Sequence, residues 1–190
     1  MIAAQITLKA IWEFLSPVLG DKLKESLKKD SSDTAKKRIY KLYRELGDLK
    51  ARTFDFITAL RLYSSLLEQQ VSPEQLREAK DSLYDRTDEL MAATADVIDA
   101  LDEVSPQLEI HDYQLYQTIA YFKGGRDAYG ITDAWSGEEF EVALEDAESG
   151  YPDQLNGILA QEEQNYRSIE QCLADFRVFI RKELPFKEGF

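Results

Sequence analysis

The sequence predicts an all-α protein, an antiparallel bundle of about five or six helices that includes a long hairpin resembling a coiled coil. Apolar residues recur every three or four positions in several segments, which is the period of one face of an α-helix. Only five prolines and nine glycines occur in 190 residues, so long helices can run without interruption. No segment sustains the strict apolar–polar alternation that is typical of a half-buried strand.

The first predicted helix is an amphipathic segment over residues 1–29, which precedes a bundle body over residues 30–190 in a single domain. Its apolar side chains, Trp12 among them, form one continuous stripe. Lys9 and Glu13 interrupt the run of apolar residues along the sequence, which argues against the unbroken apolar region of a signal peptide. The longest uncharged run in the sequence is ten residues, about half of what a transmembrane helix requires. We therefore expect the stripe to pack on the body of a cytoplasmic protein.

The next two predicted helices, over residues 33–69 and 73–104, form the long hairpin. Their apolar positions alternate between spacings of three and four, as in a heptad repeat. A connection of about three residues requires the two helices to lie antiparallel as neighbours. Ser72 and Pro73 are suited to begin the second helix, and Gln75 completes a capping box. The predicted core positions of the hairpin are Leu46, Leu60, Leu83, Leu90 and Val97.

Three further helices are predicted over residues 106–122, 137–148 and 152–183. The serine–proline pair Ser105-Pro106 is interpreted as a helix start, because serine is a good N-cap and proline is tolerated at the first helical position. The last helix is long, and its apolar stripe has the same heptad spacing as the hairpin. These helices complete the predicted bundle.

Residues that could carry catalysis or hold a metal are scarce. His111 is the single histidine and Cys172 the single cysteine, so neither a di-iron Glu-x-x-His pair nor a zinc cluster can be assembled. We expect His111 to be a solvated or capping residue and Cys172 to be a small buried side chain. Glu162 lies on the apolar stripe of the last helix, where a buried acid sets helix register or belongs to a polar site. The sequence therefore predicts no enzymatic activity, no cofactor and no metal.

The charge is distributed unevenly along the chain. The net charge is −13, yet residues 1–52 carry twelve Lys/Arg against seven Asp/Glu. Residues 53–190 carry eleven Lys/Arg against twenty-nine Asp/Glu. So acidic a body repels nucleic acid and favours basic partners, whereas the front of the chain suits an anionic surface.

A long loop over residues 123–137 is the predicted site of partner binding. It carries Arg126, Tyr129 and Trp135, and arginine and large aromatic residues commonly dominate the energy of protein interfaces. The alternative interpretation is that Tyr129 and Trp135 pack against the end of the bundle. The two interpretations differ in whether substitution there affects binding or stability.

The favoured function is that of a non-enzymatic acidic helical-bundle protein that binds a protein partner, or a second copy of itself, as an adaptor, inhibitor or antitoxin-like regulator. One alternative is a membrane-acting effector whose amphipathic front helix and basic corner dock on anionic lipid. Its lipid-contacting residues would be Trp12, Lys22, Lys24, Lys28 and Lys29. The other alternative is an enzyme without a recognisable motif.

Overall fold

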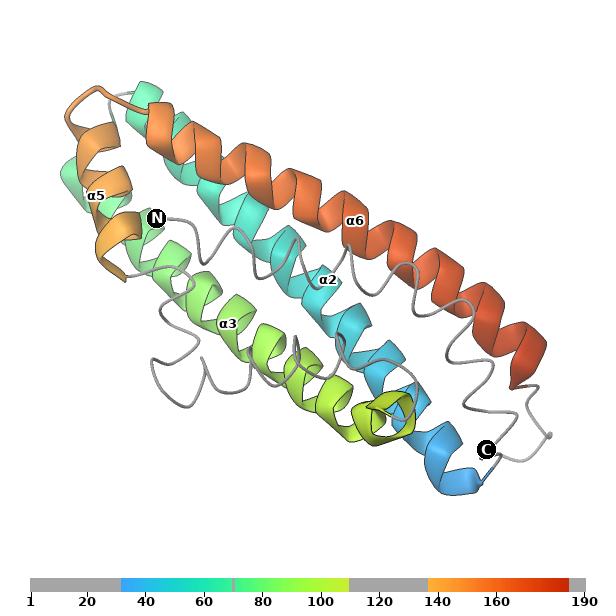
Figure 1. Cartoon of the computed structure of the whole chain (residues 1–190). Helices are drawn as coiled ribbons and strands as arrows, with labels where there is room; N and C mark the ends of the chain where they lie inside the picture. The colour runs from blue at the N-terminus through green and yellow to red at the C-terminus, as the bar shows by residue number, and fades with distance from the viewer. Residues whose placement is uncertain (1–31, 70, 110–136, 185–190) are drawn as a thin grey trace.

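The computed structural model describes residues 32–69, 71–109 and 137–184, and these residues form four α-helices and no strand (Figure 1). The predicted all-α class is therefore confirmed for this part of the chain. The predicted helix over residues 1–29 and residues 110–122 of a further predicted helix lie outside the described residues. The helices are α2 (Asp33–Glu68), α3 (Pro73–Glu109), α5 (Gly137–Glu148) and α6 (Asp153–Glu183).

Local side-chain hydrogen bonds cap the starts of the two hairpin helices. Ser32 precedes α2, and its side chain accepts a hydrogen bond from the backbone N–H of Ala35. At the start of α3 the predicted capping box is present. The N–H of Gln75 donates to Ser72 Oγ, and the N–H of Ser72 donates to Gln75 Oε1, each over 3.3 Å. Such caps satisfy backbone donors that have no partner within the helix and stabilise a helix by about 1 kcal/mol each.

The expectation that a new helix begins at Ser105-Pro106 is wrong, because α3 continues through this pair to Glu109. Proline has no N–H to donate and therefore removes one hydrogen bond from a helix interior. Pro106 lies in the last turn of α3, and the helix ends three residues after it. A serine–proline pair thus marks the start of α3 at residues 72–73 but not a second start at residues 105–106.

Helix α2 lies between α3 and α6 and packs on both (Figure 1). It runs antiparallel to α3, as the ion pairs Lys41–Glu103 and Arg52–Glu89 show, which confirms the predicted hairpin. It is also antiparallel to α6, since Lys50 pairs with Glu170 and Arg61 with Glu163. The shorter α5 packs mainly on α6, at the end of the bundle where α2 ends and α3 begins (Figure 1).

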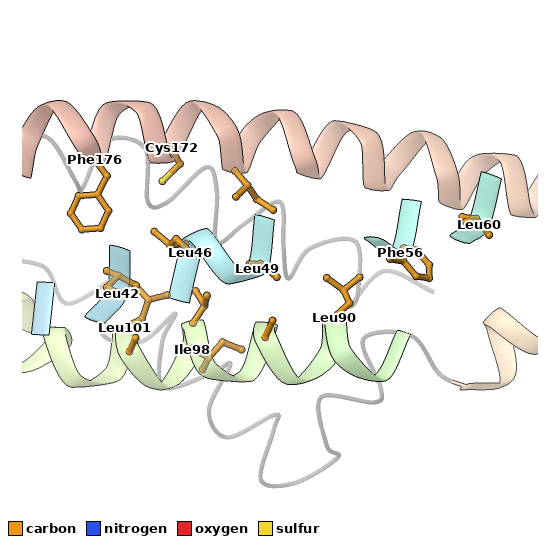
Figure 2. Packing of buried hydrophobic residues seen from close by; sticks show 14 of the residues in the cluster. Leu42, Leu46, Leu49, Phe56, Leu60, Leu90, Ile98, Leu101, Cys172 and Phe176 are labelled. Atoms are coloured by element: carbon orange, nitrogen blue, oxygen red, sulfur yellow. The ribbon is translucent and has the colours of Figure 1, made fainter. Parts of the chain in front are cut away.

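The core is a row of apolar side chains along the faces where these helices meet (Figure 2). All five predicted hairpin positions are buried: Leu46, Leu60, Leu83, Leu90 and Val97 have at most 4% of their surface exposed. Helix α6 closes the core with Ile169, Cys172 and Phe176. Burial of each large apolar side chain stabilises the fold by about 1.5–3 kcal/mol.

Side-chain hydrogen bonds tie α5 to the hairpin. The Tyr63 hydroxyl and the Lys80 ammonium both donate to Glu148 Oε1, and the lysine bond measures 2.9 Å. The Tyr84 hydroxyl donates to Glu141 Oε1 over 2.7 Å. Because these donors come from α2 and α3, they position α5 across the end of the hairpin.

A tight turn connects α5 to α6. Gly150 has a φ of 91°, a left-handed conformation that costs glycine little and other residues more. The backbone N–H of Tyr151 then donates to the carbonyl of Asp146 over 2.8 Å, which satisfies a carbonyl at the end of α5. This turn reverses the chain so that α6 can run back along α2.

Candidate functional site

The contact residues that the sequence predicts cannot be placed. Arg126, Tyr129 and Trp135 lie outside the described residues, as do Trp12, Lys22, Lys24, Lys28 and Lys29. His111 also lies outside them. The candidate sites below are therefore built from other side chains.

The outer side of α3 carries a continuous line of carboxylates. Its acidic positions follow one another at spacings of three and four residues, with a single gap at Ala92, so they share one side of the helix. They lie opposite the buried side chains of α3, such as Leu83 and Val97. We call this surface the acidic face of α3: Glu74, Glu78, Asp81, Asp85, Asp88, Asp96, Asp99 and Glu103, all exposed except the partly buried Asp99.

Cations meet this face near its two ends, where Arg77 lies between Glu74 and Asp81 and where Lys41 of α2 pairs with Glu103. Lys80 forms its ion pair with Glu148 of α5, at 2.9 Å. Arg86 pairs with Glu89, at 2.7 Å, and Glu89 also accepts from Arg52 of α2. These two ion pairs lower the pKa of Glu89, with the hydrogen bond from Arg86 as the largest cause. The cations of the hairpin are thus used to join helices.

The acidic face lowers the stability of the helix that carries it. Like charges three or four residues apart on a helix destabilise it by about 0.2–0.5 kcal/mol per pair. Asp81, Asp85 and Asp88 form two such pairs in succession, and Glu78 adds a third. A helix that served packing alone would gain stability from alternating signs of charge at these positions. The face is therefore a candidate for a role in binding.

A second group of polar side chains lies buried within α6. Glu162 is 1% exposed, and its Oε1 accepts a hydrogen bond from Asn165 Nδ2 over 3.2 Å. Gln161 in turn donates to Asn165 Oδ1 over 3.1 Å. Glu162 Oε2 is buried and has no hydrogen-bond partner among the described residues. Burial raises the pKa of the Glu162 carboxyl to about 7, and the bond from Asn165 opposes that rise.

Two buried threonines of the core form local hydrogen bonds. Thr53 and Thr94 each donate to the backbone carbonyl four residues earlier in the same helix, at 2.8 Å. Cys172 is buried, as the sequence predicts (Figure 2). Burial raises the pKa of its thiol to about 12, so the thiol is protonated near neutral pH and is a poor nucleophile.

Two absences within the described helices concern metal binding and membrane crossing. Within these helices no group of three or more His, Cys, Asp or Glu side chains is arranged to hold a metal ion. Among the same helices, none combines the length and the apolar character that crossing a bilayer requires. Both findings concern the described part of the chain.

No family model, no curated protein and no solved structure matches this chain.

The acidic face was missed in the sequence analysis, although its signal is present in the sequence. The helical spacing of its apolar positions predicts the buried side of α3, whereas the summed charge of the chain gives no position for the acids. Reading Asp81, Asp85 and Asp88 at spacings of three and four would have placed them on one side of the helix. That they face outward follows from the burial of the opposite side.

Proposed function

We propose that the protein is a non-enzymatic, acidic helical-bundle protein that binds a basic protein partner through the acidic face of α3, as an adaptor, inhibitor or antitoxin-like regulator. The observation behind the proposal is the line of outward-facing carboxylates on one helix. These carboxylates repel one another, and the helix keeps them on one side despite the cost in stability. Complementary charge raises association rates and excludes wrong partners, so a basic surface is the matching occupant.

The rigidity of the hairpin supports this role. Helix α3 packs along α2 over most of its length, and the core between them is continuous. The carboxylates are thereby held on a straight, preformed surface, which reduces the entropy lost on binding. A partner that presents a row of lysines or arginines could form several ion pairs at once.

The test compares two variants that remove equal charge from different surfaces. The first carries Asp81→Asn, Asp85→Asn and Asp88→Asn on the acidic face. The matched control carries Glu68→Gln, Glu145→Gln and Asp175→Asn, which are exposed acids of α2, α5 and α6 without ion pairs among the described residues. Each tagged full-length protein is cross-linked in cells of its source, and the captured proteins are quantified by mass spectrometry.

A basic protein captured by the wild type and the control, but at least tenfold less by the acidic-face variant, supports the proposal. With that partner in hand, the association rate should fall more than the dissociation rate rises, because charges at an interface rim act mainly on association. Capture that is equal in all three proteins contradicts the proposal. Sedimentation velocity of the wild type at low and high salt tests whether the basic partner is a second copy of this chain.

A further inference from the structure

Basic residues from two distant parts of the sequence meet where α2 begins and α6 ends. We call this surface the α2–α6 basic patch: Lys36, Lys37 and Arg44 of α2, with Arg177 and Arg181 of α6. Lys37, Arg44, Arg177 and Arg181 are exposed, and Lys36 is partly exposed. The two groups are more than 130 residues apart in the chain, so only the fold brings them together.

Two tyrosines hold these parts of the helices against each other. The Tyr40 hydroxyl donates to the carbonyl of Leu184 over 3.1 Å, and Arg177 Nε donates to the Tyr43 hydroxyl over 3.2 Å. Arg181 lies four residues after Arg177 and three before Leu184, so it shares the side of α6 that meets α2. Figure 1 shows the end of α6 running alongside the first turns of α2.

The residues that join α2 to α6 differ between the two ends of their contact. Toward the end of α2 they form ion pairs, Lys50–Glu170 at 2.7 Å and Arg61–Glu163 at 2.6 Å. At the patch the tyrosines replace the acids. Neither Lys37 nor Arg181 has an ion pair within the described part of the chain.

Two acids pair with cations of the patch and offset part of its charge. Asp33 Oδ1 is 3.8 Å from Lys36 Nζ, at the limit of an ion pair, and the aspartate side chain is 94% exposed. Glu45 pairs with Arg44 at 2.6 Å, but the glutamate side chain is 13% exposed whereas the arginine is 76% exposed. The guanidinium is therefore the group presented to solvent. Five cations against two acids leave the patch with a formal charge of +3.

We infer that the α2–α6 basic patch docks the protein on an anionic lipid surface. A flat bilayer can approach this corner along α2 and α6, because α2 lies between α3 and α6, and Glu103, the last acid of the acidic face, reaches α2 but pairs there with Lys41 (Figure 1). A polyanion that wraps around the protein would meet the acids. Tyr40 and Tyr43 are half-buried beside the cations, and tyrosine is enriched at membrane–water interfaces.

The experiment measures binding of the full chain to lipid vesicles. Vesicles of pure phosphatidylcholine are compared with vesicles that contain about one third phosphatidylserine, at low and high salt. The test variant is Lys37→Gln with Arg181→Gln, because neither side chain has an ion pair among the described residues whose loss would affect the fold. The matched control is Arg77→Gln with Arg167→Gln, two exposed cations elsewhere on α3 and α6 that also have no ion pair among those residues.

The wild type and the control should bind the anionic vesicles in a salt-sensitive manner and ignore the neutral ones. Basic residues near an anionic leaflet strengthen membrane binding, and removing two of them should weaken binding to the anionic vesicles about thirtyfold. Thermal melts of all three proteins should agree. No binding by the wild type, or equal loss in both variants, overturns the inference. Binding of the wild type to duplex DNA in place of vesicles, lost in the test variant, also overturns it.

Discussion

Glu162 is an acid on the core face of α6, where the neighbouring heptad positions are apolar. One carboxylate oxygen has a weak amide donor and the other has none among the described residues. The charged groups of α2 opposite this part of α6 are engaged elsewhere, since Arg61 pairs with Glu163 and Lys50 with Glu170. An ionised carboxylate in such a place is costly, so the carboxyl holds its proton to a higher pH than an exposed glutamate does.

We predict that Glu162 makes the protein less stable as pH rises from 5 to 8. Its pKa is raised to about 7 in the folded protein from an ordinary value of 4.5. Below pH 4.5 the group is neutral in both states and has no effect. Between 4.5 and 7 only the unfolded state loses its proton, so the free energy of unfolding falls, and above 7 the loss is complete. Urea unfolding across this range should show a decline of on the order of 3 kcal/mol.

Glu162→Gln should remove that decline and leave a protein that is more stable than the wild type at pH 8. The neutral amide can still accept the hydrogen bond from Asn165, so the packing is retained. Glu163→Gln is the control, because it removes the same charge from the neighbouring, partly exposed position. A decline of equal size in the wild type and in Glu162→Gln would show that another group is responsible.

At the scale of the elements, α2 is the helix that packs on both α3 and α6. It shares one core with α3 and α6, and ion pairs with both helices flank that core. Exposed ion pairs of this kind contribute about 0–1 kcal/mol each, less than one buried leucine. The apolar positions of the heptads therefore set the stability of the hairpin, and the ion pairs favour the antiparallel orientation.

Leu90→Ala should lower the free energy of unfolding by about 2–5 kcal/mol. Leu90 is 4% exposed in the middle of α3, and Figure 2 shows it pointing toward α2. Its removal leaves a cavity that the flanking helices can fill only in part. Leu62→Ala on the outer side of α2 is the control, since Leu62 is 54% exposed and should change the free energy by about 0.5 kcal/mol at most. Equal effects of the two substitutions, measured by urea unfolding, would contradict the assigned core.

At the scale of the whole molecule, charge is separated between two sides of the bundle. The acidic face follows the outer side of α3, whereas the α2–α6 basic patch lies where α2 begins and α6 ends. Such a separation lets one surface bind a basic protein while another meets an anionic membrane. The two proposals are independent, because their test variants carry substitutions on different helices.

Neutralising the acidic face should make the protein more stable. Asp81→Asn, Asp85→Asn and Asp88→Asn together remove four like-charge pairs, counting those with Glu78 and Glu89, which is worth about 1 kcal/mol at low salt. The melting temperature of the variant should therefore exceed that of the wild type at low ionic strength. The difference should shrink as salt screens the repulsion. A lower melting temperature for the variant would show that these acids stabilise the fold instead of opposing it.

The sequence by itself determined the helical class of the described residues, the boundaries of α2, α5 and α6, the start of α3 and the buried positions of the hairpin. These properties are local, because the period of apolar residues and the chemistry of caps depend on neighbours three or four positions away. The start of α3 at Pro73 and the burial of Leu60 and Leu83 were predicted for this reason. Pro106 is the exception, since the same local signal occurs within a continuing helix.

Only the tertiary structure decided which charges share a surface. Arg177 and Arg181 belong to the last helix in sequence, and no local pattern relates them to Lys37 or Arg44. Packing of α6 against α2 brings them together, through tyrosine hydrogen bonds between residues far apart in the chain. The orientation of the acidic face likewise depends on which side of α3 the core occupies. Surfaces are non-local because they arise from the arrangement of helices, and that arrangement is set by the sum of many weak contacts.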